Sequence, residues 1–149
     1  MTAPCVSAVP DDATRRLAAD LLDTMYAAPG RGLAAPQVGT LTRLFVMDAT
    51  WKEGVFAPLI LLNPVVEWRA DTLATGPEAC LSLPGITTMI ARATELRLRW
   101  TDLDGATQMA TLTGFAAICA QHEYDHLDGI LTLDHLDDGA RAAALAALA

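Results

Sequence analysis

The chain has 149 residues, of which 52% are hydrophobic, and its formal net charge is −8 at pH 7. This length and composition suit one domain with a buried core, which we expect to span residues 1–149. The acidic balance argues against direct nucleic-acid binding, because phosphate-binding surfaces are basic. No apolar run approaches the length that crosses a bilayer, so a membrane partner is not expected.

The cysteine pattern indicates a reducing compartment. Cys5, Cys80 and Cys119 are odd in number and widely spaced, which favours free thiols over a disulfide framework. The first residues also lack the cationic and apolar regions of a secretory signal. We therefore predict a cytoplasmic protein in which a thiol is available as a metal ligand.

The first predicted element is a helix over about residues 13–26. Apolar residues recur on one broad face of this segment, and Asp11 or Asp12 can cap its N-terminus. Pro29-Gly30 ends it, and the glycine-rich residues 30–37 then connect to the first strand. Small residues in this connection would let another backbone approach closely.

Strands dominate the middle of the chain. Residues 95–101 alternate apolar and polar side chains as a half-buried strand does, and residues 102–105 form a hairpin turn to the return strand. Gly76-Pro77 is a turn signal before residues 78–84. The other strands are predicted at residues 43–48, 59–63, 65–68 (with Pro64 between these two), 87–91 and 108–112.

A second helix is predicted from about Gly114, followed by a short strand at residues 130–133 and a short helix at residues 138–148. The strands cluster between two helices and do not alternate with them. We therefore predict an α+β fold with mostly antiparallel sheets packed around the central helix.

That central helix contains His-Glu-x-x-His within residues 121–126. Four residues advance a helix by about 400°, so His122 and His126 lie on one face, a turn apart. This geometry suits two nitrogen ligands on one divalent metal ion. Glu123 is offset enough to reach a metal-bound water without becoming a ligand. The alternative is a buried helix that carries two core histidines.

A catalytic metal usually has a third protein ligand and an open position for water. We favour Cys80, which lies in an apolar, strand-like segment, although a buried structural thiol is the alternative. His135 follows Asp134 in what reads as a surface turn, and Cys119 is on the same helix as the histidines. Both remain weaker alternatives, with Cys119 read as a small pocket or core residue.

Three stretches together resemble the peptide deformylase family, in the family's order, and the similarity extends over nearly the whole chain. Residues 30–37 (Gly-Arg-Gly-Leu-Ala-Ala-Pro-Gln), 78–82 (Glu-Ala-Cys-Leu-Ser) and 121–126 (Gln-His-Glu-Tyr-Asp-His) are similar to the family's three motifs. The resemblance implies removal of the formyl group from N-formylmethionyl peptides or nascent chains. It also implies one divalent metal ion held by Cys80, His122 and His126, with Fe²⁺ in the cell and Zn²⁺ or Ni²⁺ as alternatives.

The same resemblance implies roles for further residues. Metal-bound hydroxide attacks the formyl carbonyl, and Glu123 accepts a proton and passes it to the leaving amine. The Gln37 amide and the Leu81 backbone N–H stabilise the oxyanion. Arg92 pairs with Glu78 or Asp125, the alternative being a surface ion pair of little value. The implied substrate-binding residues are Gly32 and Leu33, through their backbone groups, together with Ala79, Phe115, Ile118 and Cys119, with Leu33 also expected near the methionine pocket.

The chain departs from the family pattern at identifiable positions. Ala79 stands where the family usually has Gly, and Thr87 stands where many members have a basic residue that helps hold the peptide. The alanine-rich end carries only Arg141, so it does not replace a basic ribosome-docking helix, and ribosome association is not predicted. Two alternatives therefore stay open: a hydrolase of another small N-acyl substrate, and a non-catalytic metal-binding relative.

Overall fold

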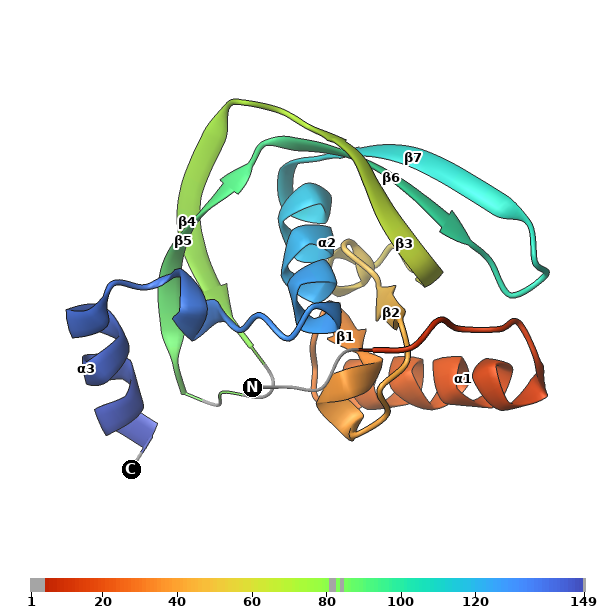
Figure 1. Ribbon diagram of the computed structural model, residues 1–149, viewed down its shortest axis with the longest axis horizontal. Helices are drawn as coiled ribbons and strands as arrows, with labels where there is room; N and C mark the ends of the chain where they lie inside the picture. Colours follow the sequence, from red (N-terminus) through yellow and green to blue (C-terminus); the bar gives the residue numbers. More distant parts are fainter. Residues whose placement is uncertain (1–4, 81–82, 84, 149) are drawn as a thin grey trace.

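The computed structural model describes residues 5–80, 83 and 85–148, and in this part of the chain two antiparallel sheets surround a central helix (Figure 1). The helices are α1 (Asp12–Ala27), α2 (Gly114–Leu127) and α3 (Asp138–Leu148), with 3₁₀ turns at Ala35–Val38, Trp51–Glu53 and Thr132–His135. The strands are β1 (Gly32–Ala34), β2 (Leu44–Met47), β3 (Leu59–Arg69), β4 (Leu73–Ala79), β5 (Thr87–Ala93), β6 (Glu95–Thr101) and β7 (Thr107–Thr113).

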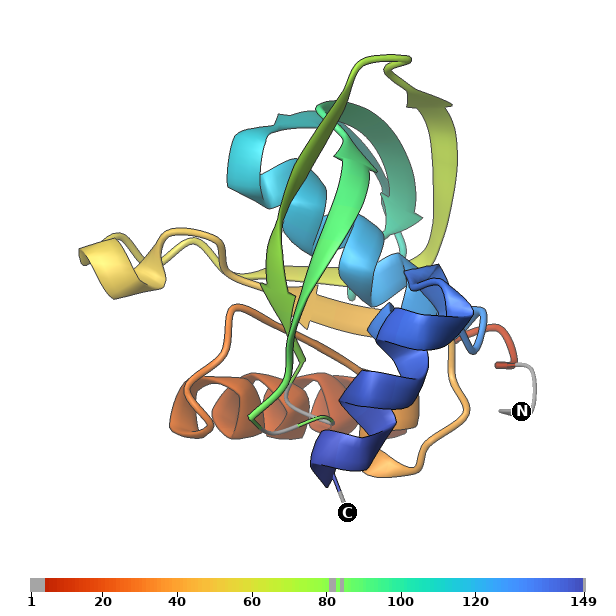
Figure 2. The same cartoon turned by 90° about the vertical axis from the view of Figure 1, so that its left-hand side faces the viewer.

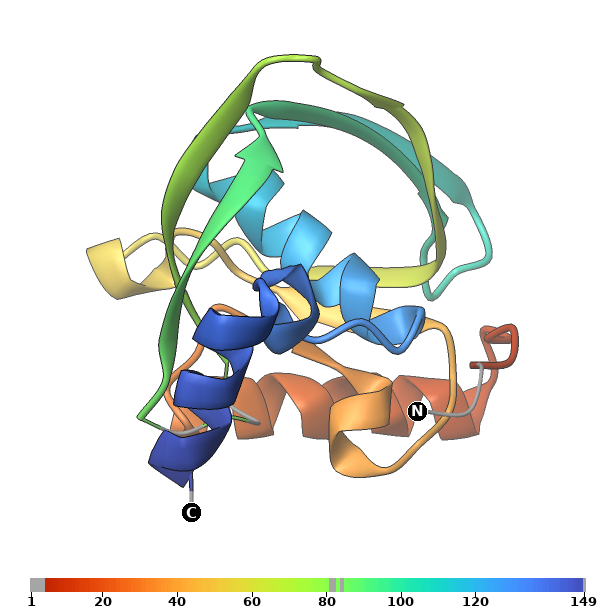
Figure 3. The same cartoon turned by 60° about the vertical axis from the view of Figure 1, so that its left-hand side comes forward.

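The five-stranded sheet has the order β1-β2-β3-β6-β7, and β4 pairs with β5 in a separate hairpin. Every strand pair is antiparallel. The chain passes from β3 into β4 over one end of α2, so the two sheets curve around that helix (Figure 3). The predicted α+β class, with antiparallel sheets around the central helix, is confirmed.

Helix α1 begins and packs as its sequence predicts. The Asp11 carboxylate accepts a hydrogen bond of 2.9 Å from the Thr14 backbone N–H and caps the first turn. Leu21 and Met25 of α1 are fully buried, and the helix itself lies below the strands in Figure 2. They belong to a cluster with Ala8, Ala18, Leu33, Ala35, Leu44, Val46 and Leu62.

Strand β2 is buried on both faces because it lies between α1 and α2. Leu44 and Val46 pack in the α1 cluster, whereas Phe45 and Met47 pack in the cluster around α2. The second cluster also contains Ala34, Leu61, Leu96, Leu98, Trp100, Ala117, Cys119, Ala120 and Leu127. None of the described helices has the length and apolar character that a membrane crossing requires.

Local sequence signals misled the prediction at several positions. Residues 59–69 form one strand, because Asn63 adopts a left-handed φ of 51° and its amide bonds the backbone of Ala8, which absorbs a bulge beside Pro64. Gly76-Pro77 lies inside β4, which pairs only with β5 and so tolerates proline at its free edge. The strand expected at residues 130–133 is wrong: a 3₁₀ turn follows instead. Strand β1 was not predicted.

Candidate metal centre

The three residues expected to bind metal converge in the structure. His122 and His126 lie one turn apart on α2, with their Nε2 atoms 3.1 Å apart. Cys80 directly follows β4, and its Sγ lies 3.4 Å from His126 Nε2. All three donor atoms are within 4.8 Å of one another. Ligands on a tetrahedral metal are spaced about 3.3–3.6 Å apart, so this donor set fits one divalent ion.

A buried carboxylate orients one of these histidines. Glu78, on the inner face of β4, accepts a hydrogen bond of 2.9 Å from His122 Nδ1. Because a carboxylate can only accept, the proton sits on Nδ1 and leaves the Nε2 lone pair for a cation. Burial alone would raise the pKa of Glu78, but the hydrogen bonds from His122 and Arg92 outweigh it and lower that pKa to about 2.

Arg92, on β5, holds Glu78 in place. Its Nε and Nη2 atoms donate to the two Glu78 oxygens, each at 2.9 Å, and its Nη1 donates to Asp125 Oδ2 at 2.6 Å. Only 6% of the Arg92 side chain is exposed. The predicted pairing is therefore confirmed with both carboxylates at once, and the surface-pair alternative is wrong.

Glu123 is a buried carboxylate beside the three donor atoms. Its Oε1 lies 3.8 Å from His122 Nε2, and its Oε2 has no hydrogen-bond partner among the described residues. Burial raises the pKa of Glu123 to about 7. An unpaired, buried carboxylate is costly unless a bound group completes its hydrogen bonds, so its position favours a water or substrate proton at this point.

Gly32 provides the space that Glu123 occupies. A Cβ built on Gly32 would lie 2.8 Å from Glu123 Cγ and 3.0 Å from Cys119 Sγ. The sequence suggested that small residues here admit another backbone. The structure shows that Gly32 instead leaves room for the side chains of Glu123 and Cys119 on α2.

The Gln37 amide points its donor at the centre. Gln37 lies on the 3₁₀ turn after β1, and its Oε1 accepts a hydrogen bond of 2.9 Å from Ala34 N. Its Nε2 then donates to Cys80 Sγ over 3.5 Å. Leu81, the other predicted oxyanion donor, lies outside the described residues, so its role stays a prediction.

The expected substrate residues surround this centre in different ways. Among the described residues β1 pairs with β2 alone, so within this part of the chain the backbone of Gly32 and Leu33 lies on an open sheet edge. The Leu33 side chain packs in the α1 cluster, and its expected place near a methionine pocket stays a prediction. Ala79 is exposed at the end of β4 and is not in the left-handed φ region.

On α2, Phe115 is half-exposed beneath the Arg31 guanidinium, 5.0 Å from its ring centre, and Ile118 is half-buried. Cys119 is buried, which raises its pKa well above the ordinary value, and its thiol donates to Arg31 O at 3.5 Å. Cys119 and His135 are both outside the group that could hold a metal ion.

Gln121, the first residue of the motif at residues 121–126, has a structural role that the sequence did not predict. Its buried amide donates to Ala93 O at 2.9 Å and accepts from Ala93 N at 3.2 Å, which fixes α2 against the end of β5. A buried amide on a helix that faces a strand is the signal that could have suggested this role.

This donor set and its buried carboxylate, on an α+β fold, define a metal-dependent hydrolase. Residues 2–142 match the family model described as polypeptide deformylase. The chain is 48% identical over 128 residues to a peptide deformylase from Alkalilimnicola ehrlichii, an alignment that covers 86% of this chain and 71% of that protein. The chain belongs to the polypeptide deformylase family, which confirms the resemblance found in its sequence.

Solved structures of peptide deformylases have the same fold as this chain. A peptide deformylase from Synechococcus elongatus in complex with actinonin has a TM-score of 0.91 at 36% identity, covering 97% of this chain and 80% of that one. The peptide deformylase from Thermus thermophilus has a TM-score of 0.87 at 40% identity, covering 97% and 85%. The fold around the centre is therefore that of the family.

Proposed function

We propose that this chain, as a single catalytic domain, hydrolyses the N-formyl group of N-formylmethionyl peptides or nascent chains. Family membership supports the reaction class. The observation that carries the proposal is the Glu123 carboxylate, which is buried beside the donor atom of His122 and has an Oε2 atom without a hydrogen-bond partner among the described residues. A protein that only retained a metal would not need this carboxylate.

A divalent ion held by Cys80 Sγ and the two Nε2 atoms would supply Lewis acidity, which polarises a carbonyl oxygen and makes water a stronger acid. Glu123 accepts the proton of the attacking water and delivers it to the amine that leaves. Gln37 Nε2 donates to the formyl oxygen as negative charge develops there. The open edge of β1 at Gly32 and Leu33 pairs with the extended peptide backbone.

The thiolate and two imidazoles suit several divalent metals, and we propose Fe²⁺ in the cell, with Zn²⁺ and Ni²⁺ as functional substitutes. Cys5 and Cys119 are free thiols and the cysteines are odd in number, which supports a reducing compartment and hence a cytoplasmic location. Nascent chains that begin with formylmethionine are the proposed partner. The net charge of −8 gives no support for direct nucleic-acid binding.

The test is formate release from formyl-Met-Ala-Ser by protein loaded with Fe²⁺, Ni²⁺ or Zn²⁺. We expect turnover, and we expect Glu123→Gln to lower kcat by about 10²- to 10⁴-fold while the metal content stays at one ion per chain. Preference for an acetyl-Met peptide would assign a different N-acyl substrate, and stoichiometric metal without turnover would assign a non-catalytic role. Either result overturns the proposal.

A further inference from the structure

We infer that His135 is a positioning residue for the metal centre, acting on His122 through a continuous chain of side chains. His135 Nε2 lies 2.8 Å from Asp125 Oδ2, which also accepts from Arg92 Nη1 at 2.6 Å. Arg92 donates two hydrogen bonds to Glu78, and Glu78 accepts a hydrogen bond from His122 Nδ1. The inference rests on the proposed role of His122 as a ligand.

The direction of each hydrogen bond in this chain is fixed by chemistry. Asp125 and Glu78 are carboxylates and Arg92 has only donors, so His135 Nε2 and His122 Nδ1 must both carry a proton. Along this series of side chains, hydrogen-bond donors and acceptors therefore alternate continuously from the surface to the cation site. Each group restricts the next, because a charged hydrogen bond in a dry environment is strong and geometrically selective.

Burial increases along this path toward the metal centre. The His135 side chain is 32% exposed, Asp125 is 13% exposed, and Arg92 and Glu78 are each 6% exposed. Two carboxylates and one guanidinium leave an excess of negative charge in this buried region. His135 supplies the second donor to Asp125, without which that carboxylate could turn toward water and release Arg92 Nη1.

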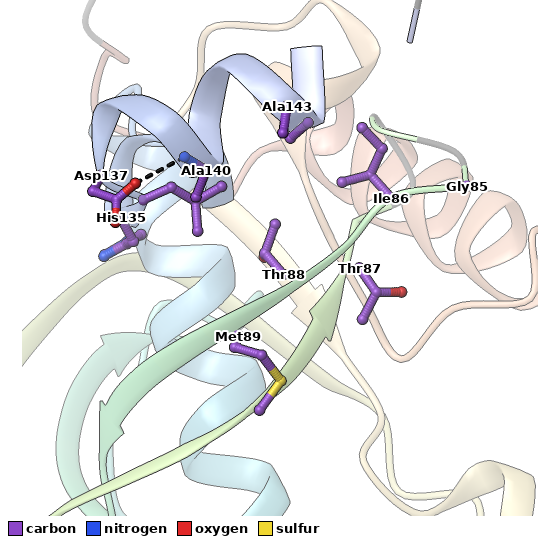
Figure 4. A pocket seen from close by; sticks show the side chains of 11 residues that line it. Gly85, Ile86, Thr87, Thr88, Met89, His135, Asp137, Ala140 and Ala143 are labelled. Atoms are coloured by element: carbon purple, nitrogen blue, oxygen red, sulfur yellow. Dashed lines mark hydrogen bonds between the residues drawn. The ribbon is translucent and has the colours of Figure 1, made fainter. Parts of the chain in front are cut away.

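His135 belongs to the segment after α2, which holds none of the three donor residues. It ends the 3₁₀ turn Thr132–His135, just before α3, and lines a pocket between β5 and α3 (Figure 4). Asp137, in the same pocket wall, caps α3 by accepting from Ala140 N at 2.8 Å. In the segment after α2, the His135 side chain therefore connects to the ligand His122 through hydrogen bonds, whereas the Asp137 side chain stabilises α3 locally.

The test compares His135→Ala, His135→Gln and Asp137→Ala by two measurements: the rate at which a chelator removes Ni²⁺, and kcat and KM for formyl-Met-Ala-Ser. Loss of a direct partner of a metal-binding histidine typically costs 10- to 100-fold, and His135 acts further out. We expect His135→Ala to lose Ni²⁺ about 3- to 10-fold faster and to lower kcat similarly, with KM unchanged.

The glutamine variant can again donate an N–H to Asp125, so it should restore both values to within about twofold. Asp137→Ala loosens the start of α3 without touching Asp125, so its Ni²⁺ should leave at the wild-type rate. The inference is overturned if His135→Ala keeps Ni²⁺ as wild type does, if His135→Gln fails to restore retention, or if Asp137→Ala loses the ion equally fast. Metal retention needs no substrate, so a wild-type protein that holds Ni²⁺ without cleaving formyl peptides would refute the proposed function separately.

Discussion

Gly32 on β1 lies directly against the side chain of Glu123 on α2. A Cβ at position 32 would stand 2.8 Å from Glu123 Cγ, which real Cβ atoms essentially never show, and 3.0 Å from its Cδ, which is tighter than most real contacts. Gly32 is not among the glycines with positive φ, so the requirement is for space and not for an unusual backbone. The close packing restricts the Glu123 rotamer and so helps to aim its unpaired oxygen.

Gly32→Ala should therefore displace Glu123 while the fold survives. We expect kcat for formyl-Met-Ala-Ser to fall by about 10²-fold, because a shift of about 1 Å in a catalytic group can cost that much. Metal content should remain at one ion per chain, since the carboxylate is not in the donor set. Steady-state kinetics and metal analysis of the purified variant measure both quantities.

Gly76→Ala is the matched control. Gly76 also lies on a strand without a positive φ, and nothing lies within 4 Å of the Cβ it would gain. This variant should keep wild-type kinetics. If Gly32→Ala were equally active, Glu123 would not be held by this contact, and its orientation would need another cause.

The Glu78–Arg92 pair should contribute strongly to the junction between the β4–β5 hairpin and α2. Arg92→Met leaves Glu78 buried without its two guanidinium hydrogen bonds. Breaking one side of a buried ion pair typically costs about 3–5 kcal/mol. We expect a loss of that size in the free energy of unfolding, measured by urea denaturation of the metal-free protein so that metal binding does not add to it.

Arg99→Met provides the comparison for an exposed pair. Arg99, on β6, binds Glu67 across the strands, but the two side chains are 45% and 35% exposed. Such pairs are worth about 0–1 kcal/mol. Equal effects of the two arginine substitutions would show that burial does not strengthen the Arg92 contacts.

The spacing of apolar residues and the helix-capping residues predicted the local structure of several elements correctly. The four-residue spacing placed His122 and His126 on one helix face, and the alternation of Leu96, Leu98 and Trp100 set the inner face of β6. Those signals are local, because they depend on backbone geometry that neighbouring residues share. The rules failed at Asn63, whose left-handed conformation is stabilised by Ala8, 55 residues away.

The centre itself depends on contacts that no local rule encodes. Cys80 approaches His126 only because β4 and β5 curve back across α2, and the composition around Cys80 could at most favour it as a ligand. The resemblance to a family supplied the donor set. It did not supply the simultaneous hydrogen bonds of Arg92 to Glu78 and Asp125, nor the contact of His135 with Asp125, since both depend on how separate elements pack.

The Asp11 cap makes the stability of α1 depend on pH. The Thr14 backbone N–H donates to the Asp11 carboxylate and so lowers its pKa in the folded protein. The cap therefore stabilises the folded protein fully at pH values above the unfolded pKa of about 3.9. Its contribution is lost as the pH falls through the folded pKa. Asp11→Ala should lower Tm by a few degrees at pH 7, and the difference from wild type should shrink below about pH 4.

Asp11→Asn separates the charge from the cap. Its side-chain oxygen still accepts from the Thr14 N–H, so most of the stability at pH 7 should return, while the acid dependence of that contribution should vanish. Thermal unfolding of the three proteins at several pH values measures this. An alanine variant whose deficit stayed constant down to pH 3 would contradict the assignment.

Ala79 is the departure from the family pattern most open to a direct test. The residue is exposed at the end of β4, beside Cys80, and its φ is not positive, so the alanine is not strained. Because Ala79 directly precedes the proposed ligand Cys80, we expect its methyl group to lie next to the path of the peptide. Ala79→Gly should raise kcat/KM for formyl-Met-Ala-Ser by about 10-fold, the lower end of the effect of one carbon group in a binding site.

Ala74→Gly controls for the greater flexibility of glycine. Ala74 is also exposed on β4 but pairs with Arg92, far along the strand from Cys80. Both glycine variants should lose about 0.5–1 kcal/mol of stability, yet only Ala79→Gly should change the kinetics. If Ala79→Gly left formyl-peptide kinetics unchanged, the methyl group would not face the substrate; if it lowered kcat/KM, the alanine would be a favourable contact for the peptide that this chain accepts.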